Sequence, residues 1–108
     1  MAQNFRRYTY NAVGTGAQAV YTANSYDAIV GISLSNILST AITVDCYIYD
    51  GSNNIYLVKD APIPTGGSLQ ILDGGAKFVV QALDVLSVKS SDAASVDVWV
   101  SAVDAIST

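Results

Sequence analysis

The side chains best suited to chemistry lie between two apolar runs, in Asp50-Gly51-Ser52-Asn53-Asn54. Oxygen atoms at this density suit calcium, but an EF-hand loop needs them at alternating positions, with a bidentate glutamate at its end. The cluster lacks that spacing, and the chain contains no glutamate. Asp-Gly and Asn favour a hairpin turn, because they tolerate positive φ and bond nearby backbone amides. We therefore interpret the cluster as a turn, with a weak calcium site shared with Asp45 or Asp60 as the alternative.

Groups for acid–base and nucleophilic catalysis are missing from the sequence. The chain has no histidine, and its 9 acidic residues are all aspartate, so the usual general base near neutral pH is absent. Cys46 has no histidine partner. Gly14-Thr15-Gly16 is not followed by the Gly-Lys-Ser/Thr of a phosphate loop. The sequence predicts a protein that is not an enzyme and that has no catalytic residues, cofactor or metal site.

The composition is that of one globular domain. The 108 residues are 51% hydrophobic and 13% charged, the reverse of a disordered chain. The single cysteine, Cys46, excludes an internal disulfide, and its place in an apolar alternation predicts a buried, inert thiol. No apolar run approaches the ~20 residues of a transmembrane helix, and no secretory signal follows Met1. With a net charge of −4 disfavouring nucleic acid, we expect synthesis in a cytoplasm and neither nucleic-acid nor membrane partners.

Short β-strands are the elements that must carry these residues. Val, Ile, Thr and Tyr are abundant and favour pleated, half-buried surfaces. Three stretches alternate most clearly, with predicted buried faces formed by Ala28, Val30, Ile32 and Leu34, by Ile42, Val44, Cys46 and Ile48, and by Val96, Val98, Val100 and Ala102. Pro62 and Pro64 are expected to end the strand after the hairpin turn. About eight strands predict an all-β, single-domain, antiparallel β-sandwich that is jelly-roll-like.

The first 16 residues differ from the rest. They hold two of the five basic residues and end in Gly-Thr-Gly, with no sustained periodicity. One interpretation is an N-terminal arm, residues 1–16, that orders only on a neighbour, ahead of a sandwich domain at 17–108. The alternative is a simple first strand at Arg7–Val13. An arm predicts that removal of residues 1–12 weakens assembly and leaves the fold intact.

Large aromatic side chains fall on the faces opposite the predicted core. Tyr47 and Tyr49 lie opposite Cys46 and Ile48, and Trp99 lies opposite Val98 and Val100. Exposed aromatic residues are enriched at protein interfaces and suit carbohydrate sites. Three interpretations stay open for these positions: ordinary core beneath a second layer, a protein interface, or a sugar site.

Several runs of the chain resemble small structural proteins of tailed bacteriophages, particularly phages of marine and freshwater cyanobacteria. The similarity rests on "YDGSNNIYLVKDAPIPTGG", "LQILDGGAK", "DVLSVKSS" and the final "VDVWVSAVDAIS", and it covers most of residues 18–106. One departure is Leu83-Asp84, where the pattern has glycine before the aspartate. The resemblance implies a β-sandwich virion component present in many copies, and it carries over no catalytic residues.

The sequence and the resemblance together predict a structural virion protein, most of all a decoration or cement protein on a capsid. Its expected partners are the major capsid protein or other virion proteins. A homo-oligomer is also expected, and a trimer would suit a three-fold site. The predicted interface residues are Phe5, Arg6, Arg7, Tyr8 and Tyr10 of the arm with Tyr47, Tyr49 and Trp99. The alternatives are a tail, collar or fibre component and a carbohydrate-binding module for host recognition that stacks Trp99 and the Tyr rings on sugars.

Overall fold

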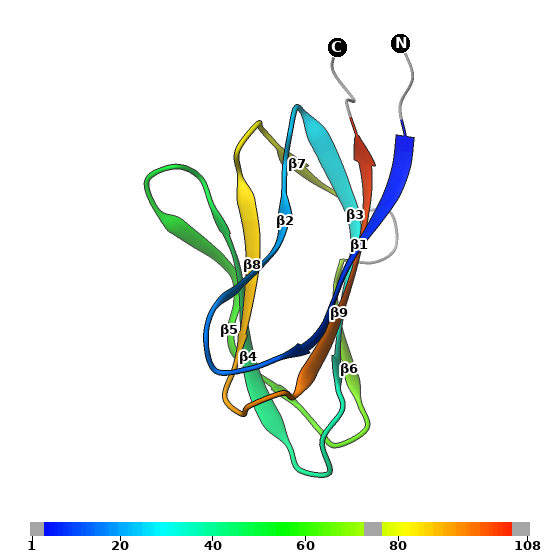
Figure 1. Ribbon diagram of the computed structural model, residues 1–108, viewed down its shortest axis with the longest axis vertical. Coiled ribbons are helices and arrows are strands. Elements are labelled where there is room, and N and C mark those ends of the chain that lie inside the picture. The colour runs from blue at the N-terminus through cyan, green and yellow to red at the C-terminus, as the bar shows by residue number, and fades with distance from the viewer. Residues whose placement is uncertain (1–3, 73–76, 105–108) are drawn as a thin grey trace.

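A two-layered β-sandwich forms the body of the protein (Figure 1). The computed structural model describes residues 4–72 and 77–104. These residues form nine strands: β1 Asn4–Val13, β2 Gln18–Thr22, β3 Asp27–Asn36, β4 Ile42–Tyr49, β5 Asn54–Ile63, β6 Ser68–Leu72, β7 Phe78–Val80, β8 Val85–Ser90 and β9 Val96–Asp104. None of the described segments is a helix long and apolar enough to cross a membrane.

The strand order is that of a jelly roll. One sheet runs β1-β9-β3-β6, with β7 also paired to β3, and the other runs β2-β8-β4-β5. β6 pairs with β3 at Ile32–Ser35 and β7 pairs with it at Asp27–Ile29, so β6 and β7 share one strand position. The chain then occupies eight positions, four in each sheet, which is the jelly-roll arrangement. The β-sandwich predicted from the sequence is confirmed.

Two of the three predicted buried faces are confirmed without change. In β4, Ile42, Val44 and Cys46 are buried, and Ile48 packs half-buried against them. In β9, all four inward positions are buried, and Trp99 points outward. These alternating side chains fill the space between the sheets, where each fully buried Val, Leu or Ile stabilises the fold by ~1.5–3 kcal/mol.

The third predicted face is wrong at Val30, whereas Ala28 is buried as predicted. Ile32 and Leu34 are buried as expected, but Val30 is 36% exposed and Ile29 is fully buried. The register between β3 and β9 shifts between Ile29 and Gly31. A bulge of this kind adds one residue to a strand and reverses the phase of the alternation. On the N-terminal side of Val30, Asp27, Ala28 and Ile29 are all buried, so the simple alternation of β3 is lost there.

Residues 4–13 of the N-terminal segment form a strand of the sandwich, which agrees with the alternative of a simple first strand. β1 pairs with β9 from Asn4 to Val13, three residues longer at its start than the predicted strand. Most of its side chains are exposed because β1 is an edge strand with one face on solvent, which hides any periodicity. Its C-terminal end is fixed inside the molecule: Val13 is buried, and its carbonyl accepts the Ser95 N–H at 2.9 Å.

The expectation that Pro62 ends its strand is also wrong. β5 continues to Ile63, with Pro62 opposite Thr43 of β4. A proline is tolerated here because β5 is the edge of its sheet, where one side of the backbone needs no partner. The pairing is interrupted nearby, at Asp60, whose φ is 51° and whose N–H bonds the Asp45 carboxylate at 2.7 Å.

The Cys46 thiol is buried, as predicted, at the centre of β4. Burial raises its pKa to about 12, so the thiol stays protonated near neutral pH. We expect a thiol reagent at pH 8 to label the native protein about a thousandfold more slowly than the denatured protein, because labelling requires opening of the core. Equal rates in the two states would contradict the burial.

The raised pKa of Cys46 also sets a pH dependence. The unfolded thiol ionises near pH 8.5 and the folded one near pH 12, so stability should fall by up to about 1.4 kcal/mol per pH unit between these values. Below the unfolded pKa the contribution is fully present. Urea unfolding of wild type and Cys46→Ala across this range checks the sign, because the variant should lose less stability with rising pH.

Candidate interaction surfaces

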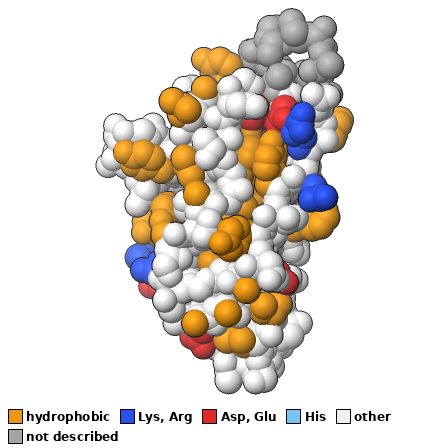
Figure 2. Space-filling view, in the orientation of Figure 1, with side chains coloured by type: hydrophobic (Ala, Val, Ile, Leu, Met, Phe, Trp, Pro, Cys, Tyr) orange, Lys and Arg blue, Asp and Glu red, His pale blue; other side chains and the backbone are white. Residues whose placement is uncertain are grey.

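One end of the sandwich collects exposed hydrophobic side chains, and we call it the turn end. In Figure 1 the β2–β3 turn and the β7–β8 turn lie at this end, between the projecting tip of the β4–β5 hairpin on one side and the start of β1 on the other. The turn end comprises Phe5, Tyr26, Tyr49, Ile55, Val79 and Leu83, each between 41% and 83% exposed. Figure 2 shows hydrophobic side chains over this end and on the projecting hairpin. Large apolar residues gathered on one surface mark an interaction site more often than scattered ones do.

Backbone contacts hold the turns of this end together. The Leu83 N–H donates to the Ala23 carbonyl at 2.8 Å, and the Ala23 N–H donates to the Asp84 carbonyl at 2.9 Å. The next residue along the chain, Val85, pairs with Tyr49 of the hairpin. The surface is thus built from segments far apart in the sequence, and of its members only Phe5 and Tyr49 were predicted interface residues.

Leu83 is the unusual member of the turn end. It is 77% exposed, and its φ is 74°, a conformation that favours glycine and disfavours bulky side chains. This is the position where the phage-protein pattern has glycine before the aspartate. The departure from the pattern was the sequence signal for this surface. A leucine at this position is neither buried in its own fold nor in a backbone conformation that leucine favours.

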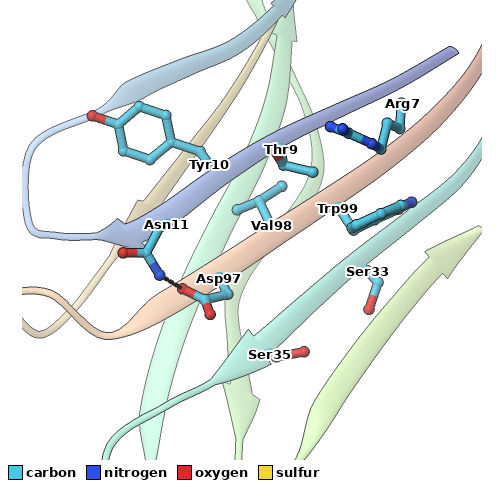
Figure 3. A pocket seen from close by; sticks show the side chains of 9 residues that line it. All are labelled: Arg7, Thr9, Tyr10, Asn11, Ser33, Ser35, Asp97, Val98 and Trp99. Atoms are coloured by element: carbon cyan, nitrogen blue, oxygen red, sulfur yellow. Dashed lines mark hydrogen bonds between the residues drawn. The ribbon is translucent and has the colours of Figure 1, made fainter.

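A second surface is a groove on the outer face of the β1-β9-β3 sheet, which we call the Trp99 groove (Figure 3). Its volume is about 370 Å³. The lining residues come from three neighbouring strands: Arg7, Thr9, Tyr10 and Asn11 of β1, Asp97, Val98 and Trp99 of β9, and Ser33 and Ser35 of β3. Three predicted interface residues, Arg7, Tyr10 and Trp99, are therefore brought together by the pairing of the first and last strands.

Charge and hydrogen bonding organise the groove. The Arg7 guanidinium lies 5.6 Å from the centre of the Trp99 ring, within cation–π range. At the other end Asn11 Nδ2 donates to Asp97 Oδ1 at 2.7 Å, and the Ala12 N–H donates to the same oxygen at 2.9 Å. Trp99 remains 52% exposed between these groups, so its ring is open to a ligand or a partner.

Arg6 and Tyr8 make contacts within the chain. The Arg6 Nε lies 2.5 Å from Asp104 Oδ2, and the Tyr8 hydroxyl donates to Asp104 Oδ1 at 3.2 Å. The Tyr8 ring lies 4.3 Å from the Tyr21 ring, and the Tyr21 hydroxyl donates to the buried Asp27. We call these five residues the Tyr8–Tyr21 cluster. Burial, followed by the charge of Asp104, raises the pKa of Tyr8 above its ordinary value.

The remaining predicted aromatic residues lie on the other sheet. Tyr47 is half-buried, and its ring packs 5.0 Å from that of Tyr56, which the sequence analysis did not single out. The Lys59 ammonium lies 4.8 Å from the Tyr56 ring. Tyr49 belongs to the turn end, where its hydroxyl donates to the Gly51 carbonyl at 3.1 Å. The structure thus divides the predicted interface residues among separate surfaces.

The Asp50–Asn54 segment is a hairpin turn. Asp50 Oδ1 accepts the N–H groups of Asn53 at 2.8 Å and Ser52 at 3.0 Å, and these bonds lower the pKa of Asp50. A calcium site shared with Asp45 is not supported, because Asp50 lies five positions further along an extended chain, about 16 Å from Asp45. Asp60 lies beside Asp45. Among the described residues no three potential ligands gather as a metal site.

Similar folds occur in two solved assemblies. No family model matches the sequence, and no curated protein matches it. The chain is similar to one in the acidic stable capsid structure of Helicobacter pylori bacteriophage KHP30, with a TM-score of 0.63 and 11% identity over 99% of this chain and 90% of that one. It is also similar to a chain of the Bacillus endospore appendages, described as a novel family of disulfide-linked pili, with a TM-score of 0.57 and 21% identity over 94% and 84% of the two chains. At these identities the likeness establishes a shared fold.

Proposed function

We propose that the protein is a structural component of a bacteriophage particle, a decoration protein that docks through its turn end between capsid subunits. The observation that carries the proposal is Leu83, an exposed leucine in a backbone conformation that favours glycine. Such a residue is explained by a contact outside its own chain. The fold shared with a chain of a phage capsid structure, and the resemblance to phage structural proteins, support the same role.

The composition of the turn end suits subunit docking. Its six members are aromatic or aliphatic, and fully burying one Leu or Phe side chain is worth ~1.5–3 kcal/mol. Aromatic residues are enriched at the centres of protein interfaces, whereas Lys, Glu and Asp are depleted. A closed homo-oligomer, such as a trimer at a capsid three-fold axis, would repeat this surface symmetrically. A tail, collar or fibre position uses the same contact on a different partner.

The test compares two aspartate substitutions at opposite ends of the sandwich. Leu83→Asp places a charge in the turn end at a φ that Asp tolerates, and Ile37→Asp places the same charge in the β3–β4 connection, where Ile37 is 47% exposed. We expect Leu83→Asp to reduce incorporation of a tagged chain into particles by about tenfold or more, since it removes roughly 2 kcal/mol of apolar burial. Ile37→Asp should be incorporated like wild type.

Mass spectrometry of purified particles measures incorporation, and circular dichroism confirms that both variants are folded. Immunogold labelling then separates a capsid position from a tail position. Equal incorporation of Leu83→Asp and wild type would refute docking through the turn end.

A further inference from the structure

We propose that the Trp99 groove is a binding site for a neutral saccharide. The first argument is that the indole ring, which Arg7 approaches at 5.6 Å, lacks a large cross-strand neighbour. Trp99 pairs directly with Thr9 on one side and with Ser33 on the other. Large aromatic residues in sheets usually pack against large cross-strand neighbours, but here both neighbours are small hydroxyl residues. The ring is left as a flat apolar plate in a polar surface, the shape that stacks on the C–H face of a pyranose.

The polar groups around the plate match a ring of hydroxyls. Both hydrogen bonds to Asp97 use Oδ1, and among the described residues none reaches Oδ2, which is left to accept. Ser33 Oγ accepts from Gln70 Nε2 at 2.9 Å, so its own proton is available to donate. Arg7 supplies further donors beside the ring. The groove therefore offers both an acceptor and donors to a polyhydroxylated ligand.

The charge of the groove favours a neutral ligand. Arg7 and Asp97 are the two charged side chains in its lining, and their charges balance. A phosphate or a nucleic acid needs an excess of basic groups, and the core of a protein interface is usually depleted in Ser and Asp. The volume of about 370 Å³ lies within the range of small-molecule sites.

The backbone beside the groove is strained. Ala12 has a φ of 59°, at the point where the register between β1 and β9 shifts between Tyr10 and Val13. Bulges re-aim side chains and are over-represented next to functional sites. At this bulge the Asn11 side chain points to Asp97, whereas the Tyr10 ring points away from Trp99 (Figure 3). Asp97 holds the bulge through the Ala12 N–H. The bulge is thus part of the architecture of the site.

The sole tryptophan of the chain makes the test direct. Because Trp99 is the single tryptophan in the sequence, the tryptophan fluorescence of the protein reports on this groove alone. The purified protein is titrated with maltohexaose, cellohexaose, chitohexaose and mannohexaose. We expect a saturable change for at least one of these probes, with a dissociation constant of about 1 mM or tighter. Affinity should be equal in about 0.05 M and about 0.5 M NaCl, because the ligand is neutral.

Calorimetry on variants then assigns the site. Trp99→Ala should weaken binding by about tenfold or more, and Trp99→Tyr, which keeps an aromatic plate and guards against misfolding, should bind more tightly than Trp99→Ala. Tyr26→Ala removes an aromatic residue of similar exposure from the turn end and should bind like wild type. No saturable binding to any probe, or unchanged binding by Trp99→Ala, overturns the proposal. So does a negative panel combined with loss of particle incorporation by Trp99→Ala, which would make the groove a protein interface.

Discussion

Deletion of residues 1–12 is expected to lower the free energy of unfolding by about 3 kcal/mol or more, out of the 5–15 kcal/mol typical of a domain. The deletion removes nearly all of β1 and exposes the edge of β9. It also removes Tyr8 from the ring contact with Tyr21 and leaves Asp104 without Arg6. Urea unfolding followed by circular dichroism measures the loss.

The matched control for this deletion keeps the strand and changes one side chain. Phe5 is 83% exposed, so Phe5→Ala should alter stability by less than about 0.5 kcal/mol. A truncated chain that unfolds at the same urea concentration as the full chain would show that β1 is dispensable for the fold. That result would restore the arm as the better description of the segment.

Asp27→Ala is expected to destabilise the protein by about 2–4 kcal/mol, because it leaves buried donors without an acceptor. Asp27 is fully buried and accepts hydrogen bonds from the hydroxyls of Tyr21 and of Ser25, the latter at 3.1 Å. Burial and then the bond to Asp27 raise the pKa of Tyr21 far above its ordinary value. The hydroxyl is therefore held as a donor throughout the neutral range.

A double-mutant cycle with Tyr21→Phe isolates the pair. Phe removes the donor and keeps the ring, so the double variant should be less destabilised than the sum of the two single variants by about 1–2 kcal/mol. Chemical denaturation of the four proteins gives this coupling energy. Strictly additive effects would mean that the Tyr21–Asp27 bond contributes nothing to stability.

The sandwich was predictable in the strands that carry no extra residue of a bulge themselves. The register shifts along β4 and β9 place their extra residues on the partner strands β5, β1 and β3. The inward residues of β4, from Ile42 to Cys46, and of β9, from Val96 to Ala102, therefore keep the period-two pattern of the sequence as their pattern of burial. In β3 the bulge beside Val30 interrupts the alternation of buried and exposed residues, and the residue types at that point do not predict a bulge. β1 gave no periodic signal because an edge strand exposes most of its side chains.

The interaction surfaces were predictable only in part. The outward position of Trp99 followed from its alternation with Val98 and Val100. Its meeting with Arg7 and Tyr10 depends on pairing between the two ends of the chain, which local sequence does not encode. The turn end depends on contacts between separate turns. The one feature of the local sequence that indicated it was Leu83 in the place of a glycine.

The proline in β5 affects whether copies of this chain aggregate through the edge of their sheets when they are packed at high density. Pro62 has no N–H to offer a neighbouring strand, and Asp60 bends the backbone of the same edge with its positive φ. Exposed edges that are long and regular recruit further strands and grow into aggregates. This edge is 10 residues long but not regular. Molecules held at high density against one another are therefore protected on that side from pairing edge to edge into fibres.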